Sequence, residues 1–226
     1  MANVLLIGST GTGKSTSLEY LNPKETFIIR VVDKALPFGG WKKNYIECKP
    51  GYIDSGNLFT TYNVDTVLKI IDAVDKKDKI KNLIIDDCQY FMAFEYMQNA
   101  KQKGYEIFKD LAYNLFLIVK RLEKVRGDLN VCLTWHPESD TDASGNRIQK
   151  AKTVGKLFDN AVTIEGMFSY VLYSEIIEEE GKLNYRFRTQ NNGANTGKSP
   201  RGCFKETLID NNMQLVFDTI NKYENG

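Results

Sequence analysis

Apolar residues along the chain gather in short continuous runs that alternate with longer amphipathic stretches. Short apolar runs of this kind predict strands buried on both faces of a parallel sheet, here at residues 4–7, 26–32, 83–85 and 131–135. Apolar positions at helical spacing predict helices over residues 15–21, 64–74 and 108–122. A further short strand is a candidate over residues 44–48. This order of strands and helices indicates an α/β fold with a mostly parallel sheet.

The pattern changes from about residue 138 onward. The turn signal at residues 142–147 separates two short segments, and residues 162–164, 170–177 and 183–188 alternate in the manner of strands. This half of the chain is therefore expected to be antiparallel, with a closing helix over residues 206–224. No linker separates the two halves, and the chain contains no internal repeat. A single domain over residues 1–226 is therefore the simplest organisation.

The composition is that of a globular protein, with 42% hydrophobic and 26% charged residues among 226. The four cysteines are far apart and form no CxxC pair, so buried free thiols are expected. The single histidine, His136, argues against a histidine-based metal site. No run approaches the length of a membrane span, so we expect a protein of the cytoplasm with no membrane partner.

The most specific motif follows the first apolar run, where GSTGTGKS at residues 8–15 fits the phosphate-loop pattern G-x-x-x-x-G-K-[ST]. In that motif glycines let backbone N–H groups face phosphate oxygens, the lysine reaches the β- and γ-phosphates, and the serine hydroxyl binds Mg²⁺. ATP and Mg²⁺ are therefore the expected ligands. The residues predicted to contact nucleotide are Gly8, Ser9, Thr10, Gly11, Thr12, Gly13, Lys14, Ser15 and Thr16.

Carboxylates follow a second buried run, in the sequence LIIDD at residues 83–87. Asp86 is expected to hold Mg²⁺ together with Ser15. Asp87 is one candidate for the base that activates the attacking water, and it could instead cap the next segment. Asp33, at the end of the run 26–32, competes with it for the role of base.

A third buried run ends in TWHPE at residues 134–138. This strand is expected to lie beside the phosphate loop, where a polar side chain can detect the γ-phosphate and pass its presence to the next loop. Thr134 and His136 are the candidates. For a lone histidine, an ordinary core or surface position is the competing interpretation.

The net charge is +1, yet ten cations fall in two stretches without an acid, residues 147–156 and 182–205. Three interpretations remain open. The stretches could bind single-stranded DNA. Lys198 and Arg201 could instead reach the γ-phosphate of a neighbouring subunit in a homo-oligomer. The cations could also be ordinary solvated side chains, balanced by acids at residues 175–180.

Together these motifs resemble the small RecA-like P-loop ATPases of bacteriophages, a group of AAA-domain and single-strand annealing proteins. The segments 26–41, with its LPFGGW, and 142–158 are also similar to that group. The resemblance implies a three-layer RecA-like core in which the Asp86 strand adjoins the phosphate-loop strand. It also implies work in phage DNA recombination, annealing or replication in the host cytoplasm, with Lys14, Ser15, Asp86 and His136 in the roles given above.

Three functions are consistent with these observations. The first is an Mg²⁺-dependent ATPase that acts on DNA. The second is a nucleotide-dependent assembly or binding module with little turnover, favoured by the lack of a clear glutamate base. The third is a nucleotide kinase, which is disfavoured because residues 27–51 contain a single arginine where such kinases carry substrate-binding cations.

Overall fold

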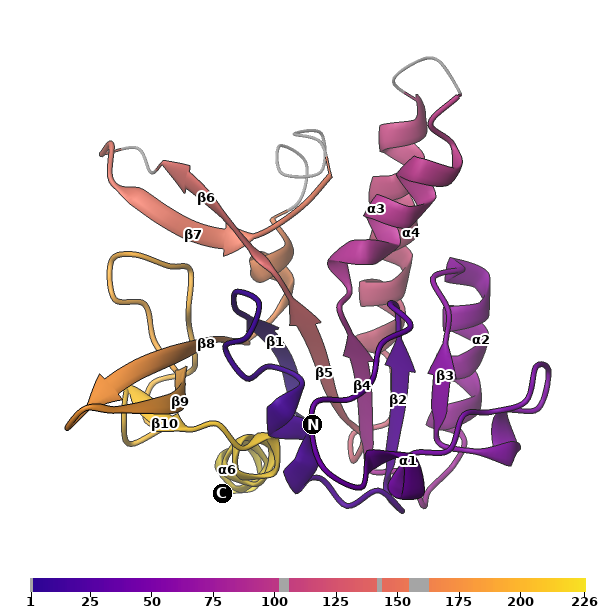
Figure 1. The fold of residues 1–226 in the computed structure, drawn as a ribbon, viewed down its shortest axis with the longest axis horizontal. Coiled ribbons are helices and arrows are strands. Elements are labelled where there is room, and N and C mark those ends of the chain that lie inside the picture. Colours follow the sequence, from indigo (N-terminus) through magenta and orange to yellow (C-terminus); the bar gives the residue numbers. More distant parts are fainter. Residues whose placement is uncertain (1, 102–105, 142–143, 155–162) are drawn as a thin grey trace.

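The computed structural model describes residues 2–101, 106–141, 144–154 and 163–226. Its centre is an eight-stranded sheet in the order β10-β9-β8-β1-β5-β4-β2-β3 (Figure 1). The strands of this sheet are β1 (Asn3–Ile7), β2 (Thr26–Arg30), β3 (Leu58–Thr60), β4 (Asn82–Asp86), β5 (Asn130–Trp135), β8 (Tyr170–Glu179), β9 (Lys182–Arg188) and β10 (Leu208–Asp210). A separate hairpin pairs β6 (Pro137–Thr141) with β7 (Arg147–Ala151).

The sheet is parallel from β3 to β8 and antiparallel beyond it. β1 pairs in parallel with both β5 and β8, and β4 pairs in parallel with β5 and β2. β8 then pairs antiparallel with β9, and β9 with β10. The predicted α/β fold, a mostly parallel sheet with an antiparallel extension, is thereby confirmed.

Helices cover the two faces of the sheet and create two hydrophobic cores. On one face lie α2 (Val64–Asp75), α3 (Gln89–Gln98) and α4 (Glu106–Leu122), and on the other lie α1 (Trp41–Asn44), α6 (Met213–Asn225) and the 3₁₀ helix η1 (Thr16–Tyr20). Neighbouring residues of one strand enter opposite cores, as Leu5 and Leu6 do, because successive strand side chains point to opposite faces. The result is the three-layer arrangement that the sequence predicts.

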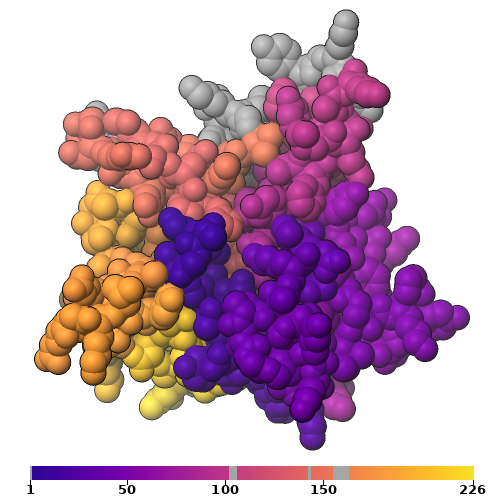
Figure 2. Space-filling view, viewed as in Figure 1, coloured from indigo at the N-terminus to yellow at the C-terminus, as the bar shows by residue number. Residues whose placement is uncertain are grey.

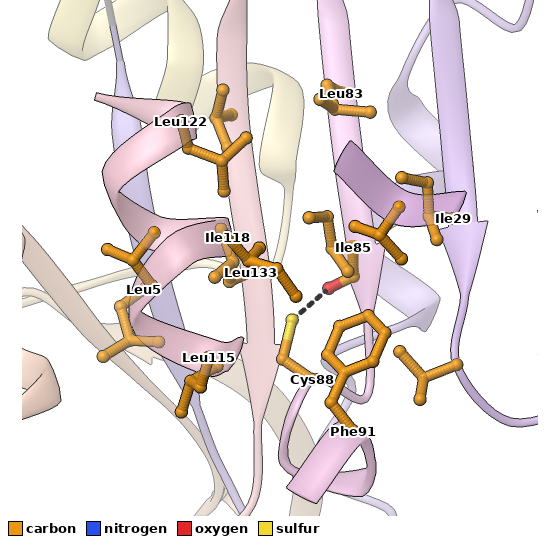
Figure 3. Packing of buried hydrophobic residues seen from close by; sticks show 14 of the residues in the cluster. Leu5, Ile29, Leu83, Ile85, Cys88, Phe91, Leu115, Ile118, Leu122 and Leu133 are labelled. Carbon is orange, nitrogen blue, oxygen red and sulfur yellow. Dashed lines mark hydrogen bonds between the residues drawn. The ribbon is translucent and has the colours of Figure 1, made fainter. Parts of the chain in front are cut away.

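The core between α4 and the sheet shows the packing in detail (Figure 3). Leu115, Ile118 and Leu122 of α4 are buried against the β4 and β5 side chains, and the Cys88 thiol donates to the Ile85 carbonyl oxygen at 3.2 Å. Burial raises the pKa of the Cys88 thiol well above its usual value. All four cysteines are buried and free, as predicted.

Several predicted elements are corrected by the structure. The helix expected over residues 15–21 is the five-residue 3₁₀ helix η1, because Asn22-Pro23 stops it after little more than one turn. The closing helix expected over residues 206–224 begins only at Met213, capped by the Asn212 side chain, and β10 occupies Leu208–Asp210 before it. Residues 44–48 contain no strand, and only Glu47 forms an isolated bridge, to Leu58.

Other differences concern the second half and the sheet order. The strand expected over residues 162–164 is wrong at Ile164, which starts the 3₁₀ helix η3 (Ile164–Met167), while residue 162 lies outside the described residues. The resemblance implied that the Asp86 strand adjoins the phosphate-loop strand. In fact β5 lies between β4 and β1 and pairs with both. In the described part of the chain, no helix is long and apolar enough to span a membrane.

Candidate functional site

The loop after β1 requires glycine at two positions. The Gly8 amide donates to the Trp135 carbonyl oxygen at 3.0 Å, so the loop starts directly against β5. A Cβ on Gly8 would lie 1.9 Å from the Ser174 Oγ and 2.9 Å from the Ser174 carbonyl oxygen, so the β8 backbone would have to shift to admit a side chain. Gly13 has a φ of +95°, in the left-handed region, and faces the Asn211 side chain. The phosphate-loop motif therefore folds as a tight wrap held between its two neighbouring strands.

Lys14 lies inside this wrap. Its Nζ donates to the carbonyl oxygens of Gly8 at 2.6 Å and Ser9 at 2.9 Å, and its side chain is buried. Burial lowers the pKa of Lys14 from 10.5 to about 8, although the charges of Asp87 and Asp86 act in the opposite direction. An incoming phosphate would add negative charge and so favour the protonated amine.

Ser15, Asp86 and Thr134 form one hydrogen-bonded group across three elements. The Ser15 hydroxyl lies 2.9 and 3.0 Å from the two Asp86 carboxylate oxygens, and the Thr134 hydroxyl donates to Asp86 Oδ1 at 2.6 Å. Burial raises the pKa of Asp86, and the adjacent charge of Asp87 adds to this shift. The carboxylate expected at the metal site is therefore in contact with the expected serine.

Thr134 has a different place from the one proposed for it. It is fully buried, and besides donating to Asp86 its hydroxyl accepts the Asp87 amide at 2.8 Å. Its hydroxyl is thus engaged with the two aspartates, and Thr134 is not among the residues that line the hollow described below. The strand that carries Thr134 does lie beside the phosphate-loop strand. The contacts of the Thr134 hydroxyl are with Asp86 and Asp87.

Asp87 adopts an unusual backbone conformation and is flanked by Lys34 and His136. Its φ of +66° is in the left-handed region, which non-glycine residues seldom occupy. Its carboxylate forms an ion pair with Lys34, and Oδ1 lies 3.4 Å from His136 Nε2. Burial alone would raise the pKa of Asp87, but the contacts with His136 and Lys34 outweigh it and the pKa is lowered. Asp87 is therefore ionised at neutral pH.

A hollow of about 450 Å³ joins these groups at the carboxyl edge of the sheet. Figure 2 shows the phosphate loop, in indigo, at the surface between the orange C-terminal hairpin and the purple segment that follows β2. The hollow is lined by Thr10, Gly11, Gly13, Lys14, Ser15, Thr16, Lys34, Ala35, Pro37, Asp87, Tyr90, His136 and Tyr185. The sequence predicted the motif residues, Asp87 and His136. It gave no reason to select Lys34, Tyr90 or Tyr185. These residues lie in the loop after β2, in the first turn of α3 and in β9, respectively.

Eight predicted residues do not line this hollow. Five of them belong to the phosphate loop or contact its surroundings, namely Gly8, Ser9, Thr12, Asp86 and Thr134, and the other three lie elsewhere. The Asp33 side chain is 83% exposed, pairs with Arg30 at 3.0 Å, and lines a separate hollow beside Asn63 and Glu95. Lys198 and Arg201 are exposed in the segment after β9, away from the phosphate loop of their own chain. Of the two candidate bases, only Asp87 lies with Lys14 and Ser15.

Several basic residues of the two acid-free stretches form ion pairs with acidic residues that lie elsewhere in the sequence. Lys150 pairs with Asp140 at 2.7 Å, Arg188 with Glu175 at 2.7 Å, and Arg186 with both Glu179 and Asp210. These pairs arise because β6 and β8 carry acids opposite the basic positions of β7 and β9. Within the two stretches, Arg147 is exposed and donates to Ser139 Oγ at 3.2 Å. The other exposed cations of these stretches with no ion pair among the described residues are Lys152, Lys182, Lys198, Arg201 and Lys205, and Lys156 lies outside those residues.

The donor atoms at the hollow suit a magnesium ion. Ser15 and Asp86 offer a hydroxyl and a buried carboxylate, which are the hard oxygen ligands that Mg²⁺ prefers. Among the described residues no cluster of three His, Cys, Asp or Glu side chains could hold a metal by itself. The set therefore fits an ion that takes its remaining ligands from phosphate and water, as Mg²⁺ usually does.

Both solved structures and family models include proteins similar to this chain. A KaiC-like protein from the hyperthermophilic archaeon Pyrococcus horikoshii is structurally similar, with a TM-score of 0.47 and 16% identity over 83% of this chain and 77% of the other. No curated protein matches the sequence. The family model described as an AAA domain matches residues 1–201. The chain therefore belongs to the AAA domain family and is a P-loop protein of the ATPase type.

Proposed function

We propose that this protein is a magnesium-dependent ATP hydrolase. The observation that carries the proposal is that Lys14, Ser15 and Asp87 line one hollow bounded by the phosphate loop, with the buried Asp86 in contact with Ser15. Buried carboxylates and a buried lysine are costly to maintain without a ligand. Their concentration at a single surface opening supports a site that binds a charged substrate.

The phosphate loop would bind the triphosphate of ATP. Lys14 would exchange its two carbonyl contacts for the β- and γ-phosphate oxygens, and the backbone amides around Gly11 and Gly13 would complete the wrap. Thr16 lines the hollow on the side expected for the α-phosphate. Ser15 and Asp86 would hold Mg²⁺, which when bound neutralises charge on the β- and γ-phosphates.

Asp87 would act as the base. Apart from its 3.4 Å contact with His136 Nε2, its Oδ1 has no hydrogen-bond partner among the described residues, so it can accept a proton from water. The water oxygen attacks the γ-phosphorus, the bond to the bridging oxygen breaks with its electron pair leaving on ADP, and the proton passes to Asp87. His136 Nε2 lies 3.4 Å from Asp87 Oδ1. His136 would detect the γ-phosphate and pass its presence to the β6–β7 hairpin that follows it.

The biological role that the sequence motifs favour is phage DNA recombination, annealing or replication in the host cytoplasm. The supporting feature is the set of unpaired cations after β9, chiefly Lys198 and Arg201, on an exposed segment. Single-stranded DNA is the proposed partner, bound through its phosphates. The same two cations could serve a neighbouring subunit's nucleotide in a homo-oligomer, and this alternative makes hydrolysis depend on protein concentration.

The test is ATP hydrolysis by the purified protein with and without single-stranded DNA, over a range of salt concentrations. We expect Mg²⁺-dependent release of phosphate, stimulated by DNA at low salt and less at high salt. Tight ATP binding with negligible turnover under all conditions would favour an assembly module. Transfer of phosphate to a nucleoside monophosphate would identify a kinase and overturn the proposal.

A further inference from the structure

Lys34 enters the hollow from a loop whose backbone is held in place. The loop follows β2, and the Lys34 carbonyl oxygen accepts a hydrogen bond from Arg30 Nη1 at 2.5 Å. Arg30 is buried and is itself bound by Thr60 at 2.8 Å and Glu47 at 3.0 Å. Two residues later Leu36 is buried in the core shared with α6. The Lys34 side chain therefore leaves from a fixed backbone position.

The Lys34 ammonium reaches the aspartates from a different segment than the phosphate-loop lysine does. It pairs with Asp87 Oδ2, and both lysines line the same hollow. Burial would lower the pKa of Lys34, but the contact with Asp87 outweighs it and the pKa is raised, so the ammonium is charged at neutral pH. Its side chain is 45% exposed, whereas that of Asp87 is 2% exposed. The cation is the accessible partner of this pair.

We propose that Lys34 is a ligand of the terminal phosphate of a nucleoside triphosphate, supplied by the same chain as the phosphate loop. This inference rests on the proposed function and identifies how the site tells a triphosphate from a diphosphate. In this structure the Lys34 ammonium forms an ion pair with the Asp87 carboxylate. When a γ-phosphate arrives beside Ser15 and Asp86, the ammonium moves to it, because a phosphate carries more charge and more acceptor oxygens than a carboxylate. The Lys34 end of the pair is accessible to a ligand, and Asp87 keeps its contact with His136 Nε2 at 3.4 Å when the ammonium leaves.

The exchange depends on the terminal phosphate. A diphosphate would leave the Lys34–Asp87 pair intact.

The experiment compares the affinities of Mg²⁺-ADP and a non-hydrolysable Mg²⁺-ATP analogue for wild type, Lys34→Met and Lys34→Arg. We expect Lys34→Met to weaken analogue binding by roughly tenfold or more, and ADP binding by less than about twofold. Lys34→Arg should retain most of the preference for the triphosphate. Lys43→Met, an exposed lysine that lines a different hollow, is the matched control and should change neither affinity.

The outcomes separate this inference from the proposed function. Equal weakening of both nucleotides by Lys34→Met, or no weakening of the analogue, would overturn the role of Lys34 while leaving the ATPase proposal intact. Failure of the wild-type protein to bind either nucleotide would instead remove the proposed function. A circular dichroism spectrum of Lys34→Met that matches wild type will show that lost binding is not lost folding.

Discussion

The phosphate-loop hollow and the basic C-terminal segments both concentrate charge, but they organise it differently. In the hollow, Lys14, Asp86 and Asp87 are buried and are joined through residues from several elements. In the C-terminal half, Arg186 and Arg188 are paired with acids of the adjacent strands near the surface. Buried charges without full mutual neutralisation indicate a ligand site, whereas surface pairs on neighbouring strands are ordinary sheet chemistry.

The largest effect should come from the base. Asp87→Asn removes the proton acceptor while keeping the shape of the side chain, and should lower the rate of ATP hydrolysis by about 100-fold or more. Binding of Mg²⁺-ATP should persist, because Lys14 and Ser15 are unchanged. Steady-state turnover and equilibrium binding, measured on the same preparation, separate these effects. Asp33→Asn is the control, since that side chain is exposed and outside the hollow, and its turnover should match wild type.

A smaller effect, on nucleotide affinity, should follow from the pKa of Lys14, which burial lowers to about 8. Phosphate binds the protonated amine, so nucleotide affinity should fall as pH rises through this value, by roughly tenfold between pH 7 and pH 9. Binding near pH 8 should take up a proton. Calorimetry in two buffers with different ionisation enthalpies measures that uptake directly. Constant affinity together with no proton uptake would show that Lys14 is not the group that meets the phosphates.

The smallest effect concerns the surface cations. If Lys198 and Arg201 bind a DNA backbone, replacing both by alanine should reduce the salt dependence of single-strand binding by about 1.4 in logarithmic slope, with little effect on ATP binding. Replacement of both Arg186 and Arg188 by alanine is the matched control, because it also removes two charges and both guanidinium groups are already paired with acids. An equal change in both variants would mean that DNA affinity reflects overall charge. A change in neither would remove DNA from these positions.

The sequence predicted the elements with strong periodicity and missed those without it. β4 and β5 are buried runs, and α2 has a clear apolar stripe, so all three appear close to where the pattern placed them. α3 was missed because its aromatic residues are spread around the helix and only its first turn is buried. β3 has three residues, too few for a pattern. The first predicted helix is instead a short 3₁₀ helix, because a motif specifies neither the type nor the length of the helix that follows it.

The site shows the same division. Lys14, Ser15 and Asp86 could be predicted because their spacing and strand context express a known chemistry. Asp33 and Lys34 are neighbours in one loop, and nothing in the sequence says that Lys34 faces the hollow while Asp33 faces Arg30. Their directions depend on the buried Arg30, which holds the loop through contacts with β3 and Glu47. Likewise, the ion pairs of β9 depend on strand register, which a count of charges along the chain does not contain.

The most direct measurement of the central claim is calorimetric titration of the wild-type protein and Lys14→Ala with Mg²⁺-ATP. Lys14→Ala removes the buried amine that would meet the β- and γ-phosphates and leaves the Ser15–Asp86 contact in place. We predict saturable binding with one site per chain for wild type and no measurable binding for a folded Lys14→Ala protein. Equal binding by the two proteins would contradict the assignment of the phosphate loop and, with it, the account of the site.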